Sequence, residues 1–210
     1  RITFDLFYRE EQTVVITSAD ETSGVAATEY LLSAEDLDIP ALEQETFLPY
    51  EKALALAPDG EYVVYARITD RAGNVTCLRS DGMVLDATAP AITGAENGGV
   101  YCAAVTLTIT DAYPVTATVN GTPVELTEVR LVLRPAEGTQ LVTATDPAGN
   151  ESRLEITVND GHTWGDWSSN GDGTHTRTCT ISGCGAPETE SCTGGEATCV
   201  DRAVCEVCGG

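Results

Sequence analysis

The sequence predicts an all-β protein made of two tandem β-sandwiches followed by a small cysteine-rich module. Three observations lead to this prediction. Alternating apolar and polar runs recur through residues 1–160, with Gly, Pro or Asn between them about every ten residues. A five-residue turn pattern occurs twice in the same stretch, and six of the eight cysteines lie after residue 160. We therefore expect sandwiches at residues 1–89 and 90–160 and the cysteine-rich module at residues 161–210.

The strands are located by period-two alternation of apolar side chains. The longest run is EYVVYARIT at residues 61–69. In AVTLTIT, residues 104–110, the large apolar side chains fall on one face opposite the threonines. Shorter alternating runs follow near residues 129–134 and 153–158. The expected inward-facing residues of these three runs are Val105, Leu107 and Ile109, then Val129, Leu131 and Leu133, then Leu154, Ile156 and Val158.

Two kinds of turn connect these strands. Asn120-Gly121 separates VTATV from TPVEL, which is typical of a two-residue type I′ hairpin. DRAGN at residues 70–74 and DPAGN at residues 146–150 are two copies of one tight turn, in which Asp and Asn bond nearby backbone groups and Gly supplies a positive φ. A calcium site on Asp70 or Asp146 is the alternative, but one carboxylate and one amide fall short of the ~6 oxygen ligands that calcium takes.

Helix is expected only at residues 33–38, where Ser33 is a candidate N-cap, acidic residues occupy the first turn and Pro40 ends the helix. The boundary between the sandwiches is expected at DATAP, residues 86–90, because the alternation stops there and the proline forces an extended backbone. Both sandwiches are large enough to bury a core without a cofactor.

The charge balance narrows the choice of partners. The chain has 11 Lys and Arg against 33 Asp and Glu, for a formal net charge of −22. Such a surface repels phosphate backbones and anionic lipid, so we expect neither nucleic-acid binding nor membrane insertion of this fragment. No run approaches the ~18 apolar residues of a membrane helix, and no targeting signal is visible, so the signal peptide and anchor are expected outside this fragment.

The segment GEYVVYARITDRAGN, residues 60–74, and the segment AEGTQLVTATDPAGN, residues 136–150, resemble bacterial immunoglobulin-like modules of Gram-positive cell-surface proteins. The resemblance implies an extracellular, cell-surface setting and a tyrosine corner at Gly60 and Tyr62. The second copy has Gln140 at the position of Tyr62, which puts the corresponding hydrogen bond in question. Such modules serve as spacers, stalks and adhesive domains, so the fold alone does not define the function.

Residues 161–210 contain little to bury and need metal or covalent cross-links to be ordered. Cys205-x2-Cys208-Gly209 has the spacing of a zinc knuckle, and Cys179-x4-Cys184-Gly185 is a looser version. The segment resembles cysteine-rich, zinc-ribbon-like repeats of bacterial surface proteins. That resemblance implies two metal clusters, the first made of His162, Cys179, Cys184 and Cys192, and the second of Cys199, Cys205 and Cys208 with a fourth ligand beyond Gly210.

Two alternatives remain open for these cysteines: structural zinc, or three disulfides as in many secreted proteins. His175 is expected to be an exposed strand residue. Cys77 and Cys102 either bridge the junction of the sandwiches or remain two separate buried thiols. Trp164 and Trp167 are expected to form the small core of the module, with a platform for a sugar ring as the alternative.

The sequence shows none of the catalytic motifs of hydrolases, zinc proteases or phosphate-binding loops, and residues 1–160 contain no histidine. We therefore expect no enzyme, no catalytic residues and no cofactor beyond structural zinc. The expected function is that of a monomeric spacer or adhesion region of a bacterial cell-surface protein, with a host-surface or glycan ligand. The alternative is an accessory carbohydrate-binding region of a larger secreted glycosidase.

Overall fold

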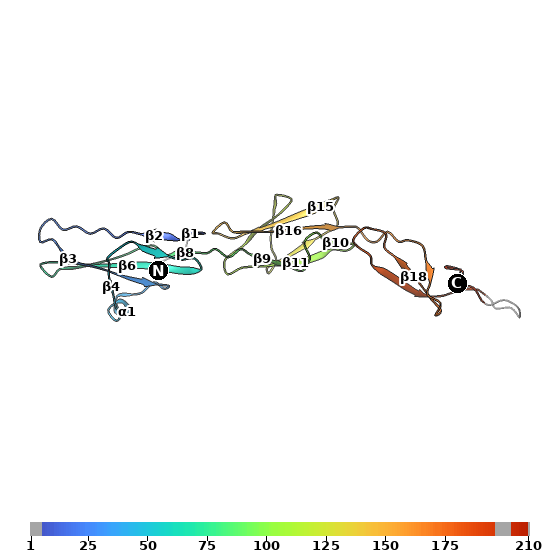
Figure 1. Ribbon diagram of the computed structural model, residues 1–210, viewed down its shortest axis with the longest axis horizontal. Helices are drawn as coiled ribbons and strands as arrows, with labels where there is room; N and C mark the ends of the chain where they lie inside the picture. The colour runs from blue at the N-terminus through green and yellow to red at the C-terminus, as the bar shows by residue number, and fades with distance from the viewer. Residues whose placement is uncertain (1–5, 196–202, 210) are drawn as a thin grey trace. The chain divides into compact units, whose positions relative to one another are not determined.

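A computed structural model describes residues 6–195 and 203–209. Nineteen strands and one short helix make up the regular structure of these residues, so the predicted all-β class is confirmed (Figure 1). The chain divides into two compact units. Unit 1 comprises residues 1–90, 111–115 and 145–151, and unit 2 comprises residues 91–110, 116–144 and 152–210. No described helix has the length and apolar character needed to cross a membrane.

Unit 1 is built on one large sheet in which β6 is the central strand. The order along the sheet is β1 (Leu6–Tyr8), β8 (Met83–Leu85), β6 (Gly60–Asp70), β3 (Val25–Ser33) and β4 (Leu48–Pro49), and β7 (Val75–Arg79) also pairs with β6. A separate two-stranded sheet joins β2 (Gln12–Val14) to β5 (Leu54–Leu56). Strands β1 and β8 are parallel, whereas β6 is antiparallel to β3, β7 and β8.

Strand β6 lies between two hydrophobic clusters, which explains why its sequence is apolar on both faces. Val64 packs with Leu54, Leu56 and Leu85 on one face. On the other face Val63 and Tyr65 pack with Phe47, and Leu31, Leu37 and Leu42 cover this cluster. The predicted strand at residues 61–69 is therefore confirmed, and burial on both faces makes it the centre of unit 1.

The tyrosine corner implied by the resemblance is present in unit 1. The hydroxyl of Tyr62 donates a hydrogen bond to the carbonyl oxygen of Ala57 at 2.9 Å. Gly60 is required beside it, because a Cβ at this position would lie 2.7 Å from the Tyr62 hydroxyl. The ring therefore folds back over a residue that has no side chain.

The helix prediction was wrong in its position. Ser33 ends β3, and the helix α1 runs from Ile39 to Leu42 with Asp38 as its N-cap. The Asp38 carboxylate accepts a hydrogen bond from the backbone N–H of Ala41 at 3.0 Å. Pro40 occupies the first turn of α1. Backbone N–H groups in the first turn make no hydrogen bond within the helix, so a proline, which has no N–H, is tolerated there. Pro40 therefore lies at the start of the helix and does not end it.

Unit 2 contains two facing sheets in its N-terminal part. The larger sheet has the order β10 (Val100–Tyr101), β16 (Glu151–Val158), β15 (Thr139–Thr145), β12 (Thr116–Val119) and β13 (Thr122–Val124). The smaller sheet has the order β14 (Arg130–Leu133), β11 (Val105–Thr110) and β9 (Ala91–Thr93). Alternate side chains of both sheets are buried, which is the arrangement of an immunoglobulin-like β-sandwich.

Eight of the nine side chains predicted to face the core of this sandwich are buried. The exception is Val129, which is 49% exposed and has a φ of 63°. It lies in the turn before β14, where the backbone conformation of the turn and not the strand alternation sets the direction of its side chain. The eight buried residues are Val105, Leu107, Ile109, Leu131, Leu133, Leu154, Ile156 and Val158.

The local turn predictions are confirmed. Asn120 and Gly121 have φ values of 50° and 77° and connect the antiparallel strands β12 and β13, as expected for a type I′ hairpin. In both copies of the five-residue turn, the first Asp accepts hydrogen bonds from the backbone N–H and the side-chain amide of the last Asn. The glycine of each copy has a positive φ.

Gln140 replaces the tyrosine corner in unit 2. Its side chain is 5% exposed, and its amide nitrogen donates to the carbonyl oxygen of Arg134 at 3.0 Å, six residues upstream. In unit 1 the equivalent bond from Tyr62 reaches five residues upstream. An amide therefore makes the same kind of backbone contact that the phenol makes in the first copy.

The C-terminal part of unit 2 is a three-stranded antiparallel sheet with the order β17 (Ser168–Ser169), β18 (Thr174–Thr178) and β19 (Pro187–Ser191). Strands β18 and β19 pair from Thr174 opposite Ser191 to Thr178 opposite Pro187. Because the strands are short and rich in Thr, Ser and Glu, this sheet buries few apolar side chains of its own. The cysteine and histidine clusters described next lie near its two ends.

Candidate metal centres

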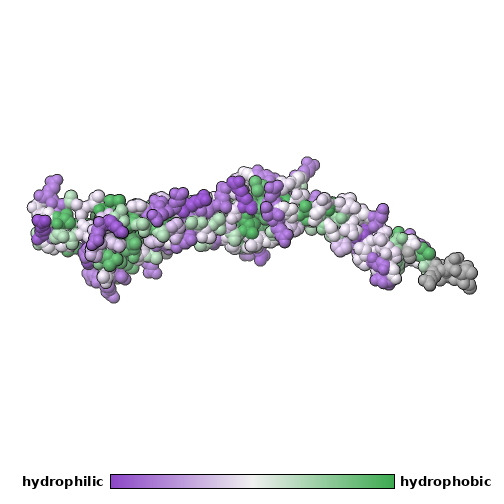
Figure 2. Space-filling model, viewed as in Figure 1, coloured by the Kyte–Doolittle hydropathy of each residue, from purple (hydrophilic) through white to green (hydrophobic). Residues whose placement is uncertain are grey.

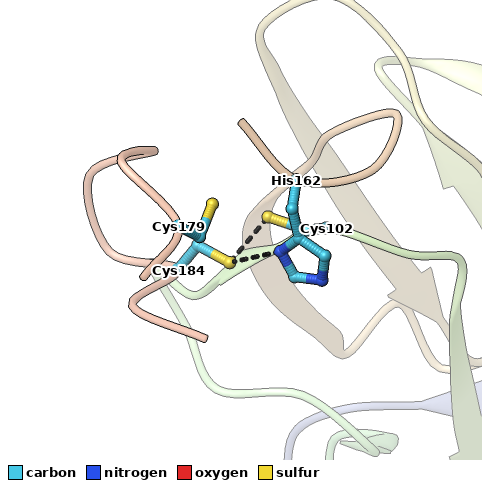
Figure 3. Close-up of side chains that lie close together, drawn as sticks. All are labelled: Cys102, His162, Cys179 and Cys184. Carbon is cyan, nitrogen blue, oxygen red and sulfur yellow. Dashed lines mark hydrogen bonds between the residues drawn. The ribbon is translucent and has the colours of Figure 1, made fainter. Parts of the chain in front are cut away.

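The first cluster combines Cys102 with His162, Cys179 and Cys184, all within unit 2 (Figure 3). One ligand atom from each residue lies within 4.8 Å of the others. The sulfur of Cys184 is 3.4 Å from Nδ1 of His162 and 2.7 Å from the sulfur of Cys102. Cys102 and Cys179 are buried, whereas Cys184 is half-buried and the His162 residue is exposed.

The second cluster combines His175 with Cys192, Cys205 and Cys208, again with the ligand atoms within 4.8 Å of one another. The Nδ1 atom of His175 is 3.5 Å from the sulfur of Cys205. His175 is only 1% exposed, so the prediction of an exposed strand residue was wrong. Thr174 and Thr176 face away from the cluster, and His175 between them faces into it, because side chains alternate along β18.

The expected membership of the clusters differs from the observed one at Cys192. The prediction placed Cys192 with His162, Cys179 and Cys184, but Cys102 occupies that place. The pairing of β18 with β19 explains the difference, because Cys192 follows the end of β19 that lies beside Thr174, whereas Cys179 follows the opposite end of β18. The four residue steps from Thr174 to Thr178 separate these ends by about 13 Å. Cys192 therefore lies at the His175 end of the sheet.

The remaining expectations concern Cys199, the pair Cys205 and Cys208, and Cys77. Cys199 lies outside the described residues. Cys205 and Cys208 do lie together, and within the described chain His175 and Cys192 complete their set. Cys77 is an exposed free thiol in unit 1, so it is neither buried nor, in the structure, bonded to Cys102. Each of the other described cysteines is also a free thiol.

Backbone N–H groups favour one thiolate in each cluster. Burial opposes ionisation of Cys179, but hydrogen bonds from the backbone of Ile181, from His162 and from the backbone of Thr163 lower its pKa to about 6. The backbone N–H groups of Cys208 and Val207 lower the pKa of Cys205 to about 6 as well. These donors are the N–H groups of tight turns, as in a metal knuckle.

A second thiol of each cluster holds its proton tightly. Burial, followed by the hydrogen bonds to Cys184 and Cys179, raises the pKa of Cys102 to about 12. Burial and the neighbouring thiols Cys205 and Cys208 raise the pKa of Cys192 to about 11. Several thiolates at this separation repel one another, so a second or third thiolate in either cluster requires a cation.

The two tryptophans connect the clusters. The Trp164 ring packs against His162 at a centroid distance of 4.6 Å, and the Trp167 ring packs edge-on against His175 at 4.3 Å. The guanidinium of Arg177 lies 5.0 Å from the centre of the Trp164 ring and 4.5 Å from the centre of the Trp167 ring. Both rings are half-buried, and their contacts support the expectation that they form the small core of this module.

The sequence analysis missed Cys102 and His175 as members of the clusters, and a count of side chains carries only part of the missing signal. The chain has eight cysteines and two histidines. Two clusters of three cysteines and one histidine use six of these cysteines and both histidines. Of the other two cysteines, Cys77 belongs to neither cluster and Cys199 lies outside the described residues. The count is consistent with one histidine per cluster, but six cysteines lie within residues 161–210, so it does not indicate Cys102 as a member.

Comparison with known proteins gives no family assignment. No family model and no curated protein matches the chain. Three of the solved structures that match have identities of 12 to 14%. Murine CEACAM1b has 12% identity and a TM-score of 0.41, with coverage of 73% of this chain and 94% of that chain. The fibronectin(III)-like modules of Clostridium thermocellum CbhA have 14% identity and a TM-score of 0.31, with coverage of 73% and 88%.

The third structure is the sialic acid binding region of a Streptococcus sanguinis SK1 adhesin, with 12% identity, a TM-score of 0.23, and coverage of 88% of this chain and 93% of that chain. All three TM-scores lie below 0.5, so the fold assignment rests on the strand order and buried cores of this chain. The chain is therefore a β-sandwich protein with two clusters of cysteine and histidine side chains that could hold metal ions.

Proposed function

We propose that the chain is a non-enzymatic structural region of a bacterial cell-surface protein, in which β-sandwiches act as spacer or adhesion modules and two structural zinc ions fold the C-terminal module. The observation that carries the proposal is the pair of clusters of three cysteines and one histidine. Four protein ligands complete the coordination of a tetrahedral zinc ion and leave no position for water or substrate. Such sites stabilise a fold and do not catalyse a reaction.

The donor set and its geometry support zinc. Thiolate and imidazole ligands suit zinc and are poor ligands for calcium or magnesium, which take oxygen. In a tetrahedral zinc site, bond lengths of about 2.3 Å to sulfur and 2.05 Å to nitrogen place these two atoms about 3.6 Å apart. The observed separations are 3.4 Å between His162 and Cys184 and 3.5 Å between His175 and Cys205. The sulfurs of Cys102 and Cys184 lie 2.7 Å apart, closer than the about 3.8 Å of two sulfurs on one tetrahedral zinc ion, so the support for zinc comes from the donor set and the nitrogen-to-sulfur separations.

The number of thiols favours metal over disulfides. Each cluster contains three cysteines, and three thiols cannot all pair with one another. Disulfide formation within a cluster would leave one thiol and one histidine without a role, whereas a four-coordinate ion uses all four side chains. Zinc supplies the positive charge that stabilises several neighbouring thiolates, and the N–H groups around Cys179 and Cys205 hold the first thiolate of each set.

Glu190 supports the same role for His175. The Nε2 atom of His175 is buried, has no hydrogen-bond partner and lies 3.9 Å from the Glu190 carboxylate on the paired strand β19. A histidine that binds an ion through Nδ1 carries its proton on Nε2, and Nε2 of His175 faces the Glu190 carboxylate. A carboxylate behind a ligating histidine fixes the ring orientation and the tautomer.

The sugar-platform alternative finds less support than the structural role. Arg177 lies against both Trp164 and Trp167, and the imidazoles of His162 and His175 contact the same two rings. A stacking platform needs an open ring face, and these contacts occupy the rings. The adhesive part of the proposal therefore rests on the resemblance of the sandwich segments to surface-protein modules, and its glycan or host ligand has no assigned site.

The test is zinc analysis of protein purified without chelator, combined with a thiol count in denaturant with and without a chelator. We expect about two zinc ions per chain. All eight cysteines should react with a thiol reagent after zinc is removed in denaturant, with most of them protected before that. A chain without metal and without reactive thiols would contain disulfides and would contradict the zinc part of the proposal.

A further inference from the structure

Three aspartates that are distant in the sequence meet within unit 1. Asp86 follows β8, Asp111 follows β11, and Asp146 begins the turn between β15 and β16. One carboxylate oxygen of each lies within 4.8 Å of the others. Asp86 is 5% exposed and Asp146 is 6% exposed, so two of these three carboxylates are removed from solvent. Burying negative charges together is costly unless a cation or a proton compensates them.

Asp86 carries an oxygen for which the structure provides no donor. Its Oδ1 accepts a hydrogen bond from the backbone N–H of Thr88 at 2.9 Å, whereas its Oδ2 is buried without any partner. Burial, followed by the charges of Asp146, Asp111 and Asp59, raises the pKa of Asp86. All three of these neighbouring charges are negative. A buried carboxylate oxygen without a donor, beside two other carboxylates, has the environment of a cation ligand.

Hydrogen bonds hold the carboxylates in place. Asn150, which is 3% exposed, donates to both oxygens of Asp146, from its backbone N–H at 2.9 Å and from its side-chain amide at 2.8 Å. The same amide donates to the backbone carbonyl of Asp86 at 2.8 Å. The backbone N–H of Tyr113 donates to Asp111 at 2.9 Å. These contacts fix the positions of the carboxylates and leave further lone pairs on their oxygens for a cation.

The first copy of the turn shows that turn chemistry alone does not produce this cluster. Asp70 and Asn74 make the same pair of hydrogen bonds as Asp146 and Asn150, at 2.8 and 2.7 Å. Both hydrogen bonds of the first copy are exposed, and Asp70 belongs to none of the ligand groups found among the described residues. In the second copy, by contrast, Asp146 lies close to Asp86 and Asp111.

We propose that Asp86, Asp111 and Asp146 bind one calcium ion. An all-oxygen set selects a hard cation, and three carboxylates offer up to about six of the 6–8 oxygens that calcium takes, with water completing the sphere. Magnesium usually keeps several waters and uses one or two carboxylates, so it fits this set less well. The site is separate from the cysteine clusters of unit 2, and the inference does not depend on zinc.

The test is a calcium titration of the full, zinc-containing chain by equilibrium dialysis, in buffer cleared of calcium with a resin. We expect about one calcium ion per chain with a dissociation constant near 0.1–1 mM, as in extracellular calcium modules. The variant Asp111→Asn should bind at least about tenfold more weakly, because it keeps an acceptor for Tyr113 but loses the charge. The matched control Asp70→Asn, altered in the other copy of the turn, should bind like the wild type.

The variant Asp86→Asn tests whether Asp86 binds calcium or only contributes to the stability of the fold. Without calcium, Asp86→Asn should unfold at the same temperature as the wild type or higher, because it removes a repelled buried charge. With calcium, only the wild type should gain stability. The proposal is overturned by no binding up to about 10 mM calcium, by wild-type affinity in Asp111→Asn, or by an unchanged calcium response in Asp86→Asn.

Discussion

Replacement of Cys102 by serine tests the cluster that joins the sandwich part of unit 2 to its cysteine-rich part. Cys102 is 8% exposed and contributes one of four ligand side chains. Structural zinc sites in small peptides have apparent binding free energies of about 10–16 kcal/mol at neutral pH. If the four ligands share this energy equally, loss of one removes about 2.5–4 kcal/mol, which corresponds to a roughly 70- to 900-fold weaker site.

The assay measures zinc content and competition with a chromophoric chelator for three variants purified in parallel. In Cys102→Ser we expect one zinc to remain tightly bound and the other to pass to the chelator at concentrations that the wild type withstands. Cys77→Ser is the matched control, because Cys77 is exposed and distant from both clusters in the sequence, and it should keep both zinc ions. Cys205→Ser should weaken only the second site.

Two results would refute this reasoning. If Cys102→Ser kept both zinc ions at wild-type affinity, Cys102 would not be a ligand and the observed grouping would be wrong. If Cys102→Ser lost both ions while Cys205→Ser lost one, the clusters would not bind independently. The first result would overturn the assigned ligands of the first cluster, and the second would overturn the independence of the two sites.

Three other predictions concern the sandwiches. Tyr62→Phe removes the hydrogen bond to Ala57 and should lower the free energy of unfolding by about 0.5–1.5 kcal/mol in urea, and no change would mean that the corner contributes nothing. Leu107→Ala, at a fully buried site of β11, should cost about 2–5 kcal/mol. Val132→Ala, at a site of the paired strand β14 that is 51% exposed, should change stability by less than about 0.5 kcal/mol. Equal effects would contradict the assigned faces of β11 and β14. Burial and a nearby carboxylate raise the pKa of Tyr113 to about 12, so the stability it contributes is complete below about pH 10 and is lost as the pH rises through 12. Phenolate absorbance should show one late-titrating tyrosine that is missing in Tyr113→Phe, and simultaneous titration of all seven tyrosines would argue against it.

The features predicted correctly from the sequence are those determined by neighbouring residues. The Asn120-Gly121 hairpin and the two Asp-to-Asn turns depend on the conformational freedom of Gly and on side chains that bond the local backbone. The helix was misplaced because a proline such as Pro40 is compatible with two positions, either just after the end of a helix or in the first turn of a helix. Capping by Asp38 decides between them, and three-dimensional placement of Leu42 against the core supports it.

The features that escaped prediction depend on contacts between distant segments. Nothing local distinguishes Cys102 from Cys77, or Asp146 from Asp70. In each pair one member reaches a cluster because strand pairing brings other segments to it. Gln140 is a further example, because its amide reaches the backbone of Arg134 through a loop whose path the sequence does not reveal. Ligand sets of this kind follow from the topology, and the topology follows from the whole pattern of strands.

The register of β18 against β19 links the folding of the C-terminal module to its metal ligands. A shift of one residue would turn His175 outward and Thr174 or Thr176 inward, because side chains alternate along a strand. Hydrophobic patterning specifies this register weakly, since the paired strands are mainly polar and are held by contacts such as the hydroxyl pair of Thr176 and Thr189. Only the observed register directs His175 at Cys205 and leaves Glu190 opposite it. An ion bound by His175 therefore selects one register, and the module should pair its strands correctly only when the second cluster is filled.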